Sequence, residues 1–322
     1  MKKRVLLIIS LVITLALSTS SWAETTGSIA VVGSGESATA TSFQLELCRL
    51  VRAIACVSVD DLKSLKKIDP KSTSHRIDQP SVIVTVGKSS LEKVLQRDLN
   101  IPIIAALVSR IPYETTIKAY HLNPQARQVT AIYADPSPYI QLALTRILLG
   151  SDKRLTLGTI LSQQSINLAP EIQRLAAGFN IDLKIEEIVD EKNLFEALAN
   201  LDKPNKVDAV LLIPDSTIYN ARSIFHLLNA KYHSRQPVIG FSPSVIKAGA
   251  IVTTAHSPQH FAQEAADLIK QYQQTGELPT PKYAESFDIV TNPDIARSLN
   301  ITMPSTAELK HRLSELVRSV QP

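Results

Sequence analysis

Polar and charged residues that suit the recognition of a small solute directly follow several short apolar runs of the sequence. They are Gly87, Lys88, Ser89, Ser109, Arg110, Ser162, Gln163, Ser165, Asp215, Ser216, Thr217 and Ser242. Arg110 or Lys88 could pair with a carboxylate, Asp215 could accept from an ammonium or hydroxyl group, and the hydroxyls and amide could orient a ligand. The pattern predicts a binding site, and no set of Ser, His and acidic residues in the sequence points to a catalytic triad.

The apolar runs themselves predict the strands that position these residues. β-Branched runs predict strands over residues 28–32, 55–59, 82–86, 103–108, 129–133, 156–161, 182–185, 209–213, 237–239 and 251–253. Apolar residues at three- and four-residue intervals predict helices over 89–98, 137–149, 168–177, 193–201, 218–231, 258–274 and 306–320. This alternation predicts an α/β fold with parallel sheets flanked by helices.

The position of the polar residues favours a cleft between two such sheets. Ligands of parallel α/β sheets bind beyond the carboxyl ends of the strands, and first-turn N–H groups of the following helices suit a carboxylate. The alternative is that each Ser, Thr or Asp only caps a helix. Capping explains any single residue, but recurrence in both halves of the chain favours a ligand cleft.

Composition and chain length favour two modest lobes. The chain has 322 residues, of which 44% are hydrophobic and 20% charged, as in ordinary globular proteins. A predicted helix ends at Gly150, and a polar turn over 151–154 precedes the next strand. We therefore expect a Rossmann-like N-terminal lobe over 24–150, a second such lobe over 151–275, and crossover segments with a C-terminal helix over 276–322.

The first 23 residues have the three-part pattern of a secretory signal peptide. Three basic residues precede an apolar stretch over 5–17, and Ser21-Trp22-Ala23 is a small-x-small cleavage motif. The stretch is shorter than the roughly 20 residues of a membrane-spanning helix, and no cysteine beside the motif could carry a lipid. We expect cleavage after Ala23, so that residues 1–23 are removed, and a periplasmic protein without a lipid anchor.

The charge balance argues against nucleic acid as a partner. The formal charge of +4 comes from 34 basic and 30 acidic residues, and removal of the three basic residues of the signal peptide leaves +1. No other run of basic residues forms the positive patch that a nucleic-acid-binding protein needs.

Cys48 and Cys56 are the two cysteines of the chain. In an oxidising compartment they could form a disulfide across seven intervening residues. They could equally be two small buried apolar side chains. Both interpretations stay open on the sequence.

Two further motifs give weak signals for a cofactor or a metal. Gly33-Ser34-Gly35-Glu36-Ser37-Ala38 fits the relaxed dinucleotide fingerprint, but its glycine pattern is common after a first strand. His256 and His260 have a metal-like spacing, but Pro258 between them indicates a helix start, and zinc needs three or four converging ligands. We expect neither a cofactor nor a metal.

Several ordered stretches between residues 82 and 309 carry a family resemblance. They are Ile-Pro-Ile-Ile at 101–104, Ala-Asp-Pro-Ser-Pro at 134–138, Val-Asp-Ala-Val at 207–210, Gln-Pro-Val-Ile-Gly-Phe-Ser at 236–242, Val-Ile-Lys-Ala-Gly-Ala at 245–250 and Gly-Glu-Leu-Pro at 276–279. Over about 70% of its length the chain thus resembles the ABC-transporter substrate-binding family of type I periplasmic-binding-protein fold, which includes tryptophan- and tyrosine-type binders.

The resemblance implies a non-enzymatic, monomeric, two-lobed binder. It would close by hinge motion on a small, amino-acid-like polar solute and deliver it to an ABC permease of the inner membrane. One alternative is a sensor or scaffold that keeps the fold and signals to a membrane receptor. A second, weaker alternative is an exported Rossmann-like enzyme.

Overall fold

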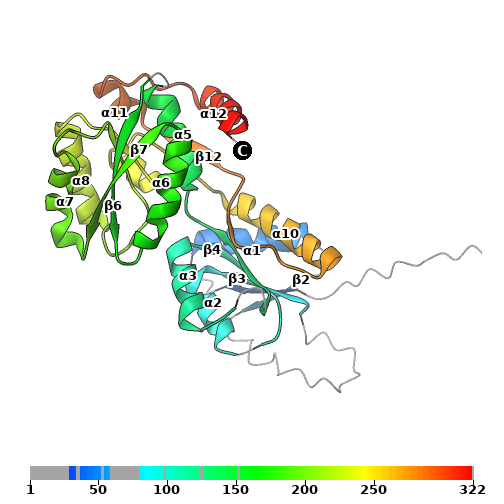
Figure 1. Cartoon of the computed structure of the whole chain (residues 1–322). Helices are drawn as coiled ribbons and strands as arrows, with labels where there is room; N and C mark the ends of the chain where they lie inside the picture. The colour runs from blue at the N-terminus through cyan, green and yellow to red at the C-terminus, as the bar shows by residue number, and fades with distance from the viewer. Residues whose placement is uncertain are drawn as a thin grey trace, which may run out of the picture.

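Two α/β lobes make up the part of the chain that the computed structural model describes, which is residues 29–33, 37–51, 54–58, 80–97, 99–123, 127–150 and 153–320. Each lobe has its own six-stranded sheet with helices on both faces (Figure 1). The predicted fold class is therefore confirmed. The predicted signal peptide over 1–23 lies outside the described residues. Within them, no helix has the combined length and apolarity of a membrane-spanning segment.

The N-lobe is built on a parallel sheet with the strand order β11-β5-β4-β3-β1-β2. Its strands are β1 (Ile29–Gly33), β2 (Ile54–Ser58), β3 (Val82–Val86), β4 (Ile103–Val108), β5 (Val129–Tyr133) and β11 (Lys282–Tyr283). Its helices are α1 (Ala38–Leu50), α2 (Gly87–Leu95), α3 (Arg110–Ala119) and α10 (Pro258–Thr275). Alternate strand residues face opposite sides: Val31 packs with α1 and α10, and Val32 packs with α2 and α3.

The C-lobe is built on a sheet with the strand order β12-β10-β9-β8-β6-β7. Its strands are β6 (Leu155–Ser162), β7 (Ile181–Ile188), β8 (Ala209–Leu211), β9 (Val238–Ile239), β10 (Val252–Ala255) and β12 (Asp288–Thr291). Its helices are α5 (Pro138–Leu149), α6 (Ala169–Gly178), α7 (Leu194–Leu201), α8 (Ala221–His233), α9 (Pro243–Ala248), α11 (Pro293–Ser298) and α12 (Thr306–Val320). The edge strand β12 runs antiparallel to β10, whereas the other strand pairs are parallel.

The two sheets share one topology. In both, the second strand lies outside the first, and the third, fourth and fifth follow on the other side. The strand order therefore reverses between β1 and β3 in the N-lobe and between β6 and β8 in the C-lobe. Such switch points, at the carboxyl ends of the strands, are where open α/β sheets bind ligands.

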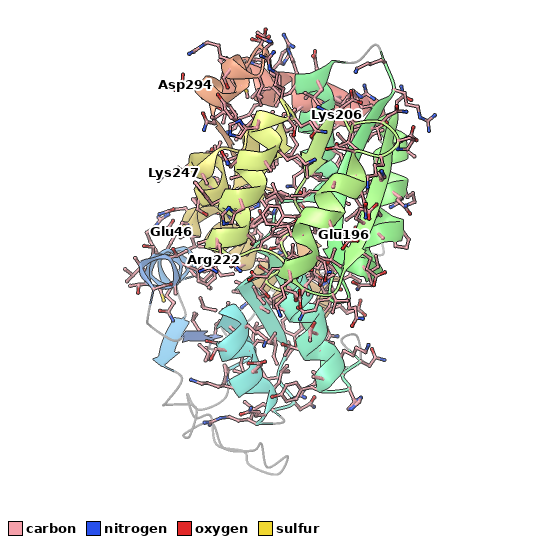
Figure 2. All side chains as sticks on the ribbon, turned by 90° about the vertical axis from the view of Figure 1, so that its left-hand side faces the viewer. Glu46, Glu196, Lys206, Arg222, Lys247 and Asp294 are labelled. Atoms are coloured by element: carbon pink, nitrogen blue, oxygen red, sulfur yellow. The ribbon has the colours of Figure 1, made fainter. Side chains whose placement is uncertain are left out.

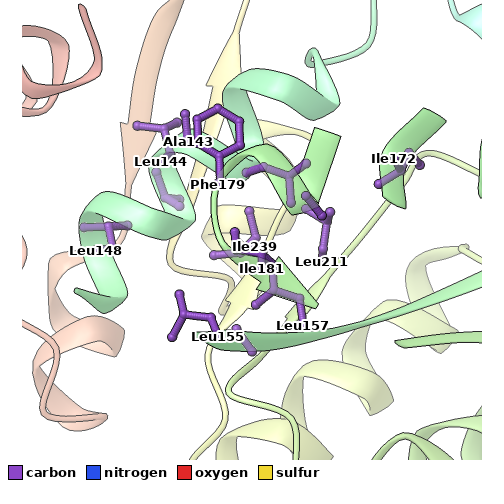
Figure 3. Close-up of a cluster of buried hydrophobic side chains, with 14 of the residues drawn as sticks. Ala143, Leu144, Leu148, Leu155, Leu157, Ile172, Phe179, Ile181, Leu211 and Ile239 are labelled. Carbon is purple, nitrogen blue, oxygen red and sulfur yellow. The ribbon is translucent and has the colours of Figure 1, made fainter. Parts of the chain in front are cut away.

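The chain passes between the lobes earlier than the predicted boundaries at 150 and 275. Helix α5 belongs to the C-lobe, because Ala143, Leu144 and Leu148 share one apolar core with Leu155 and Phe179 (Figure 3). Helix α10 returns to the N-lobe, where Phe261 and Ile269 join the core under α1. Helical periodicity shows which face of a helix is apolar, but it does not identify the sheet that covers this face.

The C-terminal segment links both sheets. It adds β11 to the N-lobe and then β12 to the C-lobe, and α12 packs beside α5 and β12 (Figure 1). The chain therefore crosses between the lobes near residues 134–137, 256–257 and 284–287. These three crossings are the covalent links between the described parts of the two lobes.

Of the two cysteines in the disulfide prediction, the structure describes the side chain of one. Cys48 is disulfide-bonded. The side chain of Cys56 lies outside the described part of the structure, so the pairing of the two cysteines stays a prediction.

Candidate functional site

A cavity of about 590 Å³ lies between the lobes. The N-lobe lines it with Lys88, Ser109, Ile111, Pro112 and Thr115, and the C-lobe lines it with Gln164, Pro214, Asp215, Ser216, Tyr219 and Phe241. Several of these residues follow β3, β4, β6, β8 and β9, so the cavity lies at the carboxyl ends of both sheets and at the switch point of the C-lobe. Four residues of the predicted binding set, Lys88, Ser109, Asp215 and Ser216, thus meet at one place.

Asp215 lies at the centre of a hydrogen-bonded group, here called the Asp215 cluster: Asp215, Ser162, Ser165 and Thr217. Its Oδ2 accepts from Ser162 Oγ at 2.6 Å, from Ser165 Oγ at 2.5 Å and from Ser162 N at 3.4 Å. Its Oδ1 accepts from Thr217 N at 2.8 Å. Asp215 is only 6% exposed. The cluster therefore ties the loop after β6 to the loop after β8.

Arg110 lies beside Ser109 but binds across the cleft instead of lining the cavity. It forms the Arg110 cluster with Glu114, Glu171 and Tyr283. Its Nη1 and Nη2 donate to the two carboxylate oxygens of Glu171 at 3.0 and 2.7 Å, and its Nε donates to Glu114 at 2.8 Å. Nη1 also donates to the Tyr283 hydroxyl at 3.1 Å. Because Glu171 is on α6, this cluster joins the N-lobe to the C-lobe.

The protonation of Arg110 is fixed by these partners. Burial acts to lower the pKa of Arg110, but the hydrogen bonds to Glu171, Tyr283 and Glu114 outweigh burial and raise the pKa above its ordinary value. The guanidinium also lies over the rings of Tyr133 and Tyr283, at 6.0 and 5.7 Å from their centroids. Arg110 is therefore a permanent cation held between two carboxylates and two aromatic rings.

Asp135, in the first crossing between the lobes, holds the start of α3. Its Oδ2 accepts from Arg110 N at 2.7 Å. Burial raises the pKa of Asp135, although the hydrogen bonds from the Arg110 backbone and the Ser109 side chain act in the opposite direction. The hydroxyl of Ser109 thus binds Asp135 inside the protein, although Ser109 also lines the cavity.

Lys88 is the cation that remains accessible to the cavity. Its side chain is 51% exposed and pairs with Glu92, one turn further along α2, at 3.0 Å. Gly87 begins this helix with a φ of 78°, a conformation that favours glycine. Ser89 is exposed on the same turn but does not line the cavity. Gly87 therefore shapes the backbone, and Lys88 supplies the charge.

The other predicted residues have structural positions beside the cavity. Ser242 caps α9 by accepting from Val245 N at 3.3 Å, and Thr217 donates its backbone N–H to Asp215. Gln163 is exposed and lies outside the lining, whereas its neighbour Gln164 lines the cavity. Ser242 caps a helix, and Ser162 and Ser165 hydrogen-bond the loop after β6 to Asp215. The binding roles of the whole set stay predictions.

The sequence analysis missed the apolar part of the lining. Ile111, Pro112 and Thr115 lie on α3, which the sequence analysis did not predict, because the helix follows its strand after a single residue. Tyr219 and Phe241 face one another with ring centroids 5.7 Å apart. The position of Phe241 shortly after a predicted strand was an available signal, but only polar residue types were selected there, whereas Tyr219 falls in the predicted helix 218–231.

The two histidines of the weaker metal motif have structural partners in the described ranges. His256 Nδ1 lies 2.8 Å from Ser286 O, and His260 belongs to the capping box of α10 with Ser257. No three His, Cys, Asp or Glu side chains gather to hold a metal ion within residues 29–320 as far as these are described. Of the predicted dinucleotide motif, residues 34–36 lie outside the described part.

Comparison with known proteins connects this geometry to a family. The family described as "ABC transporter substrate binding protein" matches residues 61–310, which is more than half of the chain. The chain belongs to this family. No curated relative matches the chain by sequence.

Solved structures similar to this substrate-binding protein share its two-lobed fold. One is a ligand-free, open substrate binding protein with adhesive properties from Clostridium difficile, with 14% identity, coverage of 87% of this chain and 96% of that one, and a TM-score of 0.62. Another is an ABC domain in complex with L-Trp from Streptococcus pneumoniae, with 13% identity, coverage of 88% and 97%, and a TM-score of 0.53. A conserved domain protein from Vibrio cholerae is similar at 16% identity, coverage of 89% and 98%, and a TM-score of 0.54.

The family gives the coarse function. Members of a substrate-binding family bind a small solute, partner an ABC permease and are generally not enzymes. Because the similar structures have low sequence identity to this chain, their similarity supports the fold alone. The nature of the solute therefore has to be argued from the residues of this chain.

Proposed function

We propose that this protein is the periplasmic solute-binding component of an ABC-type uptake system, and that it captures a small polar solute between its lobes. The observation that carries the proposal is the cavity of about 590 Å³ that both lobes line at the carboxyl ends of their strands. Such a volume fits a small organic molecule, and a site shared by two lobes favours closure on the ligand. The similar protein from Streptococcus pneumoniae holds L-Trp, which supports a ligand of comparable size.

Hinge closure is part of the proposal. The three crossings near residues 134–137, 256–257 and 284–287 connect the two lobes, so a change of their backbone angles would open or close the cleft. A solute that binds both lobes stabilises the closed form by as much as it binds that form better than the open one. The closed form is then the species that a permease would recognise.

Secretion follows from the signal-peptide pattern. We expect mass spectrometry of the exported protein to give an N-terminus at Glu24. An intact N-terminus at Met1 in the periplasmic fraction would contradict cleavage after Ala23.

A ligand screen tests the binding function. A solute that binds the folded protein raises its melting temperature by mass action, so we expect at least one amino acid, organic acid, nucleobase or vitamin to do so. Ser216→Trp places a large ring in the cavity and should abolish the shift, whereas Ser298→Trp on α11 of the C-lobe is a matched exposed control outside the lining. No shift across the panel, or an equal shift in Ser216→Trp, would contradict binding in this cavity.

A further inference from the structure

We propose that one face of the C-lobe is a docking surface for the permease, and that it takes a permease segment with an apolar side chain beside carboxylates. The surface consists of three exposed rings and two exposed cations and is here called the aromatic patch: Phe195, Phe225, His226, Lys192 and Arg222. The proposal rests on the proposed uptake function and adds to it the surface and the chemistry of the contact. None of the five residues lines the cavity between the lobes, so the patch is separate from the solute site.

Two phenylalanines on α7 and α8 are exposed. Phe195 is 56% and Phe225 is 61% exposed. The chain has seven phenylalanines, and the other five are buried or half-buried. The ring of His226 lies next to both, with its centroid 5.9 Å from that of Phe195 and 5.7 Å from that of Phe225. Single exposed apolar residues are common on protein surfaces, whereas contiguous apolar patches mark interaction sites.

The packing of α8 does not explain Phe225. The buried residues of this helix are Ser223, Leu227, Leu228 and Lys231. With 3.6 residues per turn, these four side chains share one side of the helix, and Phe225 points away from that side. A polar residue at this position would leave the core of the C-lobe unchanged. Core packing therefore gives no reason for an aromatic ring there.

A hollow of about 310 Å³ lies beside the rings, between α7 and α8. Its lining includes Leu194, Phe195 and His226, which offer apolar and aromatic surface. Protein interfaces are often anchored by one apolar side chain that fills such a pocket on the partner. The hollow can therefore take a single apolar side chain of a docked segment.

The charges around the hollow favour a partner with carboxylates. Lys192 and Arg222 line it, and neither has an ion-pair partner in the described part of the chain. The carboxylate in the lining, that of Glu191, already accepts from the side-chain amide of Asn220. Arg222 lies in the first turn of α8, where the helix dipole disfavours a cation, so helix stability does not explain its place. Two unpaired cations beside exposed rings complement an acidic and apolar segment.

The patch lies close to the solute site. Figure 2 shows Arg222 and Glu196 near the end of the C-lobe that faces the N-lobe. The loop before α8 carries Tyr219, which lines the cavity, and ends at Asn220. The Asn220 side chain caps α8 by accepting from Arg222 N at 2.9 Å. A partner on the patch therefore contacts residues that directly follow the cavity wall, which suits a partner that receives the solute.

The size of the patch indicates a transient contact and not a stable dimer. With about 200 Å² for a whole phenylalanine side chain, the two exposed rings offer on the order of 200 Å² of apolar surface. A stable dimer of two copies of the chain needs about 800 Å² on each partner. A delivery protein has to leave its partner after each transfer. A small patch with flanking charges therefore fits a permease better than a second copy.

Photo-crosslinking in the native host tests the identity of the partner. The analogue p-benzoylphenylalanine replaces Phe195 or Phe225, and mass spectrometry identifies the cross-linked peptides. We expect the membrane subunit of an ABC permease, joined through a segment that has Asp or Glu beside an apolar residue. The same analogue at Asp294 is the control and should give little of this product. Asp294 is exposed on α11, at the end of the C-lobe away from the N-lobe (Figure 2).

Charge reversal tests the role of the cations. In the protein with the analogue at position 225, Arg222→Glu should lower the yield of the permease cross-link about tenfold, because an attractive contact becomes repulsive. Arg222→Lys keeps the charge and should keep most of the yield. Lys247→Glu on α9 is the matched control, since Lys247 is exposed on the same side of the C-lobe but outside the patch (Figure 2). Unchanged melting temperatures should show that all three variants fold.

The outcomes separate this proposal from the proposed function. A cross-link to a second copy of the chain, or no cross-link from either patch position, would overturn the docking surface. An undiminished yield in Arg222→Glu would overturn the charge contact. A permease cross-link from Asp294 alone would reject the patch but keep the uptake function. Solute binding is judged separately by the melting-temperature screen with Ser216→Trp, because none of the patch residues lines the cavity.

Discussion

The Arg110 cluster and the Asp215 cluster differ in what they hold together. Each contains a charged side chain that the sequence suggested for ligand binding, Arg110 or Asp215. In the structure each of these side chains is hydrogen-bonded to other residues of the protein. The Asp215 cluster joins two loops within the C-lobe. The Arg110 cluster joins helix α3 of the N-lobe to helix α6 of the C-lobe. Only the second cluster depends on how the lobes lie relative to one another.

This difference assigns the two clusters to different physical roles. All partners in the Asp215 cluster belong to the C-lobe, so the cluster contributes to the stability of that lobe and to the shape of the cavity, and the proposed hinge motion should leave it intact. The Arg110 cluster would change its contacts in the proposed hinge motion, so it should contribute to the balance between lobe arrangements. Substitutions in the first cluster should act on unfolding, and substitutions in the second on lobe geometry.

The largest effect on stability is expected for Asp215→Ala. Loss of the carboxylate leaves the buried hydroxyls of Ser162 and Ser165 without their acceptor, which should lower the free energy of unfolding by about 3 kcal/mol. Urea unfolding measures this loss. Asp267→Ala on the exposed face of α10 is the control and should change stability by less than about 0.5 kcal/mol. Equal stability of the two variants would show that Asp215 does not hold the loops.

An intermediate effect is expected for the pair Arg110 and Glu171. The pair is partly buried, with side-chain exposures of 18% and 34%, and bidentate. A double-mutant cycle with Arg110→Ala and Glu171→Gln should give a coupling energy of about 1 kcal/mol. Small-angle X-ray scattering should show a changed average radius of gyration in both single variants, because the cross-lobe contact is lost. An unchanged radius in both would contradict the proposed role in lobe geometry.

Much of the fold could be predicted from local sequence patterns. Strands such as 82–86 and 103–108 are β-branched runs covered on both faces, and the caps of α10 at Ser257 and Gly276 mark that helix clearly. The short strands β11 and β12 were missed, because a two-residue and a four-residue edge strand carry too little periodic signal. The lobe assignment of α5 was also missed, because it depends on packing between distant segments.

The position of the candidate cavity at the strand ends could be predicted from the sequence. The partners that its charged residues bind could not. Lys88, Ser109, Gln164 and residues 214–216, which follow predicted strands, line the cavity, because parallel strands direct their carboxyl ends to one edge, whereas the binding roles of the predicted residues stay predictions. Two of the three partners of Arg110, Glu171 and Tyr283, are 61 and 173 residues away along the chain. No spacing rule connects residues so far apart, so the sequence could not show that this cation was already bound.

The smallest effect is expected for Arg154 and Asp182, which form a bidentate pair of similar geometry on the surface of the C-lobe. Arg154 Nε and Nη2 donate to the two Asp182 oxygens at 2.5 Å each, but the side chains are 65% and 51% exposed and belong to one lobe. Exposed pairs are screened by water and salt. Arg154→Ala should therefore change neither the urea midpoint nor the radius of gyration measurably. Arg154→Ala could instead alter the radius of gyration as much as Arg110→Ala does. In that case any bidentate ion pair would influence the lobe arrangement, whether or not it bridges the lobes, and the distinction between the two clusters would be wrong.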